Sequence, residues 1–185
     1  MCIRDSNYTN ALAALALGSL AGLPMAAMLD ALTQFTGLPH RCEWVTSKNG
    51  VVWINDSKAT NTGATVAAID GLGAELQGKI VLIAGGDGKG ASFDDLKPSV
   101  QRYVRAVIVL GKDGLRLAET LQNIVAIHTV SDMGTAVSKA AEVANAGDIV
   151  LLAPACASLD MYKSFEHRGQ IFCQHVNHYV ENLHG

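Results

Sequence analysis

The sequence predicts an α/β fold: a doubly wound, mostly parallel sheet of about six strands with one antiparallel hairpin strand, preceded by two helices. Apolar runs alternate with helix-like stretches from residue 79 onward. These runs are continuous, which is typical of parallel strands covered on both faces. Asn49-Gly50 separates two strand-like runs, and this dipeptide favours a hairpin turn. Hydrophobic residues make up 49% of the chain, which is enough to form a core.

The expected elements follow in order along the chain. A helix is expected over residues 7–21, and a second helix from Pro24 to about Phe35, because proline is common where helices begin. Thr-Gly-Leu-Pro at 36–39 interrupts the helical pattern, so we expect a domain boundary there. The later expected helices are 62–72, 93–101, 114–122, 132–145 and most of 158–183, and the expected strands are 42–47, 51–56, 79–84, 105–110, 124–130 and 148–154.

Charge, hydropathy and cysteine usage exclude several classes of protein. The net charge is −3 and no basic block is present, so a nucleic-acid partner is not expected. No apolar run approaches the ~20 residues of a membrane helix, and the start, MCIRDS, lacks the apolar segment of a signal peptide. The four cysteines show no CxxC spacing: Cys2, Cys42, Cys156 and Cys173. We therefore expect a cytoplasmic protein with reduced thiols and no membrane partner.

Three polar clusters follow predicted strands: Asn-Asp-Ser-Lys-Ala-Thr-Asn at 55–61, Gly-Gly-Asp-Gly-Lys-Gly-Ala-Ser at 85–92, and Ala-Cys-Ala-Ser-Leu-Asp at 155–160. In an open α/β sheet, ligands bind outside the carboxyl ends of the strands. We therefore expect the three clusters to form one site.

The glycine-rich cluster has two interpretations. Its glycines can turn backbone N–H groups toward an anion, and Lys89 adds a positive charge. The run is not a phosphate-binding loop of the G-x-x-x-x-G-K-[ST] type, because Ile83 and Gly90 occupy positions that this motif restricts. The alternative is an ordinary strand-to-helix turn with a solvated lysine.

The other strand ends also have two interpretations each. Ser158 and free helix N–H groups can hold a carboxylate or phosphate, but the pattern alone favours Ser158 as the cap of the expected helix. Asp56 can bind a ribose hydroxyl or a metal and Lys58 a phosphate, but the pair can also form an Asx turn with an ion pair. Cys156 has no identifiable base partner, so we expect a small buried thiol.

Polar residues outside the clusters are weaker candidates. Arg41, next to His40, can clamp a phosphate or form a salt bridge between domains. Asn7 and Asn10 can cap the first helix or bind a base edge. The pair His175 and His178 on the last helix lacks a carboxylate or fourth ligand, so we expect no metal site.

Five segments, in this order and spacing, resemble the carboxyl-terminal part of the Mur ligases: NYTNALAA, GLPHRCE, NDSKATN, LIAGGDGKG and PACASLDMYKSFEHRG. They are most similar to the branch of the family that adds D-glutamate. The resemblance runs from Asn7 to the end of the chain. It departs at Ser6, where the family usually has histidine, and residues 1–6 match nothing in the family. We therefore expect a foreign start over residues 1–6.

The resemblance implies a three-domain, cytoplasmic enzyme, monomeric when full length. Residues 7–37 are similar to the last helices of the central ATPase domain, and residues 38–185 to the whole Rossmann-like carboxyl-terminal domain. The phosphate-binding loop, and with it most of the Mg²⁺ site, is implied to lie in the central domain. The 185 residues contain no G-K-[ST], so we expect the chain alone to be inactive.

The resemblance also implies a role for each candidate residue. The ATP-binding residues would be Asn7, Asn10, His40, Arg41 and Asp56. Lys58 would act in catalysis near the phosphates or the acyl group. The D-glutamate pocket would be formed by Thr60, Lys89, Ser158 and the backbone of Phe165.

The implied reaction is ATP-dependent amide-bond formation between D-glutamate and UDP-N-acetylmuramoyl-L-alanine through an acyl phosphate, in peptidoglycan precursor synthesis. Two alternatives stay open: a non-catalytic nucleotide- or anion-binding module, and a folylpolyglutamate-synthase-like ligase domain.

Overall fold

The computed structural model describes residues 5–182 and divides the chain into two compact units, which meet at Leu38 and Pro39. The first unit is a pair of helices, α1 (Asp5–Leu20) and α2 (Met25–Gln34), with Pro24 at the amino-terminal cap of α2. Two short helices cannot enclose a core. Accordingly, α2 buries no residue, and large apolar side chains of this unit are exposed, namely Leu12, Leu17, Leu20, Leu23, Met25, Leu29, Phe35 and Leu38.

The second unit opens with the predicted hairpin, β1 (Glu43–Lys48) and β2 (Val51–Asn55), which pair antiparallel. Asn49 and Gly50 have φ values of 52° and 76°. These left-handed values are those that a two-residue hairpin turn requires at both central positions. The dipeptide therefore acts as the sequence predicts.

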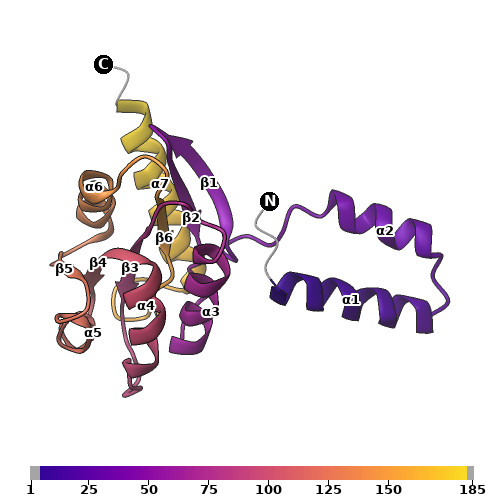
Figure 1. The fold of residues 1–185 in the computed structure, drawn as a ribbon, viewed down its shortest axis with the longest axis horizontal. Helices are drawn as coiled ribbons and strands as arrows, with labels where there is room; N and C mark the ends of the chain where they lie inside the picture. The colour runs from indigo at the N-terminus through magenta and orange to yellow at the C-terminus, as the bar shows by residue number, and fades with distance from the viewer. Residues whose placement is uncertain (1–4, 183–185) are drawn as a thin grey trace. The chain divides into compact units, whose positions relative to one another are not determined.

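The sheet has six strands in the order β1-β2-β6-β3-β4-β5, as Figure 1 shows. The remaining strands are β3 (Ile80–Gly85), β4 (Val104–Leu110), β5 (Ala126–Thr129) and β6 (Ile149–Leu152). Every pair of neighbours except β1–β2 is parallel. The predicted fold class is thus confirmed, and β6 lies between β2 and β3.

Helices cover both faces of the sheet (Figure 1). One face packs against α3 (Thr62–Gly73), α4 (Lys97–Tyr103) and α5 (Gly114–Leu121), and the other against α6 (Met133–Val143) and α7 (Phe165–Asn182). Trp53 on β2 is 1% exposed, with ring centroids of Phe172 and Tyr179 within 6.3 Å and 5.9 Å. Truncating such an aromatic core residue to alanine typically costs ~3–5 kcal/mol.

A partly buried ion pair lies at the opposite end of the sheet from the polar clusters. Asp148, just before β6, is 1% exposed and accepts hydrogen bonds from Arg105 Nε (2.6 Å) and from the N–H groups of Lys79 (2.8 Å) and Asn145 (2.9 Å). Burial alone would raise the pKa of Asp148, but these donors outweigh it and hold the pKa below its ordinary value. Asp148 therefore stays ionised inside the domain.

The predicted helix over 158–183 is wrong at its start. The carbonyl oxygen of Ser158 accepts from the N–H groups of Met161 (3.1 Å) and Tyr162 (2.8 Å) and forms a turn. The helix begins only at Phe165, where the hydroxyl of Ser164 accepts from the His167 N–H (3.2 Å). Leu183 lies outside the described residues.

Two smaller differences occur elsewhere. Strand β5 is shorter than predicted, and its residues are half-buried or exposed, because it forms the edge of the sheet. The helix predicted at 93–101 begins with a 3-10 turn, Asp94–Leu96, before α4. No helix within residues 5–182 is long and apolar enough to cross a membrane.

Candidate functional site

The three polar clusters meet at one edge of the sheet, as predicted, because they follow the neighbouring strands β2, β6 and β3. Backbone hydrogen bonds join them. The N–H of Ala155 donates to Ala59 O (3.0 Å), which links the clusters after β6 and β2. Asp87 and Ala157 exchange two hydrogen bonds of 3.0 Å and 2.9 Å, which link the clusters after β3 and β6. The three clusters are thus joined to one another by backbone hydrogen bonds.

Arg168 on α7 connects two of these clusters, the one after β2 and the one after β6. Its side chain is 2% exposed, and it donates from Nε to Ser57 Oγ (3.0 Å), from Nη2 to Ser57 O (2.9 Å) and from Nη1 to Cys156 O (3.1 Å). Ser57 Oγ in turn donates to Phe165 O (2.8 Å). Burial lowers the pKa of Arg168 to about 10. Sequence reasoning missed this role; the signal was an arginine one turn into a helix that packs on the sheet.

Lys58 contacts an aromatic ring rather than lying free in a turn. Its ammonium lies 3.9 Å from the centroid of the Phe165 ring, a cation–π contact. Its backbone N–H donates to His40 O (3.1 Å), and the His40 ring meets Phe165 edge-on at 6.2 Å. The structure therefore brings together three residues that the sequence analysis assigned separately.

His40 is buried, with a φ of 61° that is uncommon for a residue with a side chain. The amide Nδ2 of Asn55 lies 2.9 Å from His40 Nδ1, and the Asn55 Oδ1 accepts from the Ser57 N–H (3.1 Å), which fixes the orientation of the amide. The His40 ring packs directly on Gly169 of α7, where any Cβ would collide with it.

The residues beside His40 differ in exposure. Arg41 is exposed at the surface. Asp56 is 6% exposed, and its Oδ1 accepts from the N–H of Cys42 (3.0 Å), so this carboxylate shapes the loop that presents Arg41. Asn10 is exposed on α1, in the first unit. The side chain of Asn7 lies outside the described part of the structure.

Several N–H groups of the glycine-rich loop already donate to protein acceptors, which disfavours an anion nest built from these groups. Gly85 donates to Pro154 O (2.8 Å) and Asp87 to Ala157 O (3.0 Å). Gly88 donates to the carboxylate of Asp113 (2.7 Å), and Lys89 to that of Asp87 (2.9 Å). What the loop presents is the Lys89 side chain, which is exposed.

The last two predicted ligand residues follow β2 and β6. Thr60 is half-buried, and its N–H donates to Lys58 O (2.8 Å). Ser158 is 3% exposed and lies seven residues before α7, so the prediction that it caps that helix is wrong. Cys156 is fully buried, which confirms the predicted buried thiol, and burial raises its pKa to about 12.

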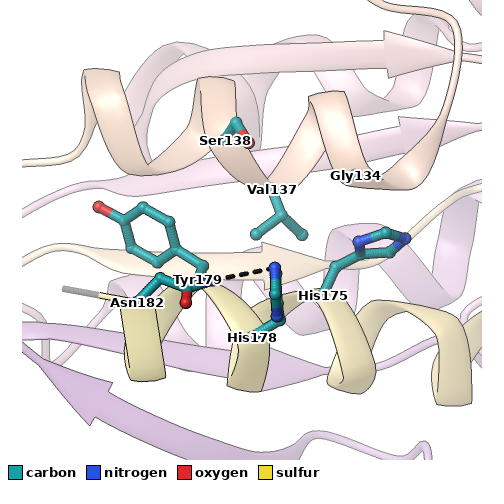
Figure 2. Close-up of a pocket in the computed structure, with 7 residues that line it drawn as sticks. All are labelled: Gly134, Val137, Ser138, His175, His178, Tyr179 and Asn182. Carbon is teal, nitrogen blue, oxygen red and sulfur yellow. Dashed lines mark hydrogen bonds between the residues drawn. The ribbon is translucent and has the colours of Figure 1, made fainter. Parts of the chain in front are cut away.

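His175 and His178 lie away from the three clusters. They line an open groove of about 360 Å³ between α6 and α7, shown in Figure 2, with Gly134, Val137, Ser138, Tyr179 and Asn182. His178 Nε2 is 2.9 Å from Asn182 Nδ2. Over residues 5–182 there is no group of three histidine, cysteine or carboxylate side chains that suits a metal ion.

Comparisons with known proteins agree on one family. A family model described as "Mur ligase, glutamate ligase domain" matches residues 40–156. The UDP-N-acetylmuramoylalanine–D-glutamate ligase of Pseudomonas putida is 60% identical over 168 residues, covering 91% of this chain and 37% of that protein. The protein of the same name from Nitrosococcus oceani is 58% identical over 171 residues, covering 92% and 37%. The chain thus spans a little over a third of the length of the curated relatives that it matches.

Solved structures share the fold. The UDP-N-acetylmuramate–alanine ligase of Thermotoga maritima superimposes with a TM-score of 0.71 at 16% identity, covering 97% of this chain and 39% of that one. A bifunctional folylpolyglutamate synthase/dihydrofolate synthase of Yersinia pestis, complexed with AMPPNP and a manganese ion, gives 0.59 at 23% identity, covering 88% and 35%. At such identities the likeness supports the fold alone.

Proposed function

Because the chain belongs to the Mur ligase family, we propose that it is the carboxyl-terminal part of a cytoplasmic, ATP-dependent ligase that joins D-glutamate to UDP-N-acetylmuramoyl-L-alanine. ATP phosphorylates the carboxylate of the alanyl substrate. The amine of D-glutamate attacks the acyl phosphate, and phosphate leaves from the tetrahedral intermediate. The relatives named for this reaction are 60% and 58% identical to the chain.

The observation that best supports this function is that the three polar clusters, which include Lys58 and Lys89, lie together at one edge of the sheet. D-Glutamate has two carboxylates, and its proposed ligands are Thr60, Lys89, Ser158 and the backbone of Phe165, which follow the ends of β2, β3 and β6, while Lys58 is proposed to act near the phosphates or the acyl group. Charge-assisted hydrogen bonds are the natural ligands of carboxylates. In the proposed reaction this domain holds and orients the amino acid, with Phe165 placed beneath Lys58.

The nucleotide side of the site is proposed to consist of Asn7, Asn10, His40, Arg41 and Asp56. Arg41 is exposed and held by the turn that Asp56 anchors, so its guanidinium is available for a phosphate. His40 is buried against α7. Its carbonyl oxygen accepts from the Lys58 N–H and its ring contacts Phe165, so we propose that it also positions these two residues.

The Mg²⁺ that the proposed reaction needs is proposed to be held mainly by the central domain. Residues 5–182 offer no group of three suitable side chains, and the Asp56 carboxylate already accepts from Cys42. The central domain and the substrate phosphates would supply most ligands of an Mg²⁺ ion in phosphoryl transfer.

The test is a chimera in which residues 7–185 replace the matching segment of the Pseudomonas putida ligase. We expect phosphate release that requires ATP, UDP-N-acetylmuramoyl-L-alanine and D-glutamate together. The chain by itself, which contains no G-K-[ST], should release none. Release that proceeds equally without D-glutamate would contradict the proposed substrate, and turnover by the chain alone would contradict its role as one part of a larger enzyme.

The folylpolyglutamate-synthase-like alternative predicts a different result. Such a domain would accept L-glutamate with a reduced folate as the acyl substrate. The chimera assay therefore includes L-glutamate in place of D-glutamate, and equal rates with the two enantiomers would favour the alternative. A non-catalytic anion-binding module would leave the chimera inactive although folded.

A further inference from the structure

Lys89 occupies a backbone conformation that its surroundings must maintain. Its φ is 52°, and that of Gly90 is 77°. A residue with a side chain loses roughly 1–2 kcal/mol in this left-handed region, so such residues persist where neighbouring contacts hold them. The N–H of Ala91 donates to Gly88 O (2.9 Å) and closes a turn around Lys89. The stability of this turn decides where the Lys89 ammonium lies.

The first turn of α5 holds both ends of that turn. The Asp113 carboxylate accepts from the Gly88 N–H (2.7 Å) and from Arg116 Nη1 (2.9 Å). Arg116 Nη2 donates to Ala91 O (3.2 Å). The Asp113 carboxylate thus binds Gly88, just before Lys89, and the Arg116 guanidinium binds Ala91, two positions after it.

An aromatic ring lies under the same turn. Phe93 is 2% exposed, and the Arg116 guanidinium carbon lies 5.6 Å from its ring centroid. A Cβ built on Gly88 would stand 2.8 Å from Phe93 Cζ and 3.3 Å from Asp113 Oδ2. The loop thus has no free space on this side, and Gly88 is the only kind of residue that fits between ring and carboxylate.

We propose that Asp113 and Arg116 are positioning residues for Lys89, and that they hold its ammonium where a ligand carboxylate is bound. The inference rests on the proposed function, in which Lys89 binds D-glutamate. Arg116 acts through the backbone of the turn, because its guanidinium donates hydrogen bonds to Asp113 and to the carbonyl oxygen of Ala91. Without this support the turn would sample other conformations, and binding of D-glutamate would lose the benefit of a preformed site.

The kinetic test uses the chimera with Arg116→Ala and Arg116→Lys. Arginine is 47% exposed along its side chain here, so both variants should fold. We expect each to raise the KM for D-glutamate at least threefold while the KM for ATP changes less than twofold. Lysine should not rescue, because one ammonium cannot reproduce two N–H groups directed at two acceptors.

The matched control is Lys139→Ala, which removes another exposed i,i+3 ion pair, with Glu142 on α6 (2.6 Å). A KM for D-glutamate that is the same in the Arg116→Ala and Lys139→Ala variants would overturn the inference.

A second measurement does not depend on activity. Hydrogen exchange of the 185-residue chain should show the Gly88 and Ala91 amides exchanging at least tenfold faster in Arg116→Ala, with amides of α6 unchanged. Unchanged exchange at Gly88 overturns the positioning role even if Lys89→Ala impairs D-glutamate use, in which case the proposed function stands. Lys89→Ala without effect on the KM for D-glutamate removes Lys89 from the site and overturns both.

Discussion

Replacing Arg168 with methionine tests whether one buried guanidinium holds the ligand loops in place. Arg168 is 2% exposed and donates to Ser57 Oγ, Ser57 O and Cys156 O at 2.9–3.1 Å. Methionine fills much of the same space but donates nothing. The variant therefore leaves two buried carbonyl oxygens, those of Ser57 and Cys156, without this donor.

The size of the effect follows from these contacts. A buried acceptor that loses its partner costs ~1–3 kcal/mol, so the two carbonyl groups together cost roughly 2–6 kcal/mol. Removing a charge from the interior offsets part of this cost, since burial already lowers the pKa of Arg168 to about 10. We expect a net loss of about 2–4 kcal/mol in the free energy of unfolding. For a domain of this size, that lowers Tm by roughly 4–16 °C.

Urea and thermal unfolding of the 185-residue chain, followed by circular dichroism and by fluorescence of the buried Trp53, would measure the loss. Arg102→Met on α4 is the control, because Arg102 is exposed and such changes usually stay within about 0.5 kcal/mol. An Arg168→Met variant as stable as Arg102→Met would refute the reasoning that Arg168 joins these loops.

Three further outcomes are expected. In the chimera, Lys89→Ala should raise the KM for D-glutamate at least tenfold and leave the KM for ATP unchanged, because a lost charge-assisted hydrogen bond costs roughly 1.5–3 kcal/mol. A KM for D-glutamate within twofold of the parent, in a folded variant, would count against a role of Lys89 in binding. Arg41→Ala and Asp56→Ala should impair the use of ATP more than the use of D-glutamate, as measured by steady-state kinetics with each substrate varied. An unchanged KM for ATP together with an unchanged kcat would contradict a role of these residues in binding ATP. The pKa of Asp148 is lowered in the folded state, so Asp148 contributes stability that is present above its unfolded pKa of about 4 and is lost as pH falls through its folded value. In the Asp148→Asn variant, the free energy of unfolding measured by urea titration should therefore fall less steeply as the pH is lowered. An unchanged pH dependence would show that other carboxylates govern the loss of stability in acid.

The fold was largely predictable because its signals are local. Continuous apolar runs such as residues 80–84 identify buried strands, and Asn49-Gly50 identifies the hairpin through its two left-handed residues. The start of α7 was not predictable in the same way. The sequence indicates a cap at Ser158, but residues 158–162 form a turn closed by hydrogen bonds to Ser158 O, and the helix begins only at Phe165.

The site was predictable in location but not in its internal bonds. Strand ends indicate the right edge of the sheet, yet the glycine-rich loop donates to Asp113, which is 25 residues further along the chain. Likewise, Ser57 and Arg168 are 111 residues apart. No spacing rule connects such residues, because the sheet order places them together and the sequence does not state that order.

The same long-range bonds decide which lysine at this edge can bind a ligand. Lys89 and Lys112 both follow strand ends within a Gly-Lys pair, so the sequence alone does not rank them. In the structure, Lys112 Nζ lies 3.1 Å from the Asp87 carboxylate and its N–H donates to Asp160 (2.9 Å). The hydrogen bond and charge of Asp87 raise the pKa of Lys112, and its charge is already balanced.

Lys89 differs from Lys112 in this respect. Within residues 5–182, no ion pair involves its ammonium, and only its backbone N–H is bound, by Asp87. The acidic residues of this edge thus hold the loop and neutralise Lys112 and Arg116, which leaves the positive charge of Lys89 for an incoming carboxylate. Substitution of each lysine in the chimera would distinguish them. Lys112→Ala should leave the KM for D-glutamate within threefold of the parent. An increase in this KM as large as that caused by Lys89→Ala would contradict the proposal that Lys89 is the lysine that binds the carboxylate.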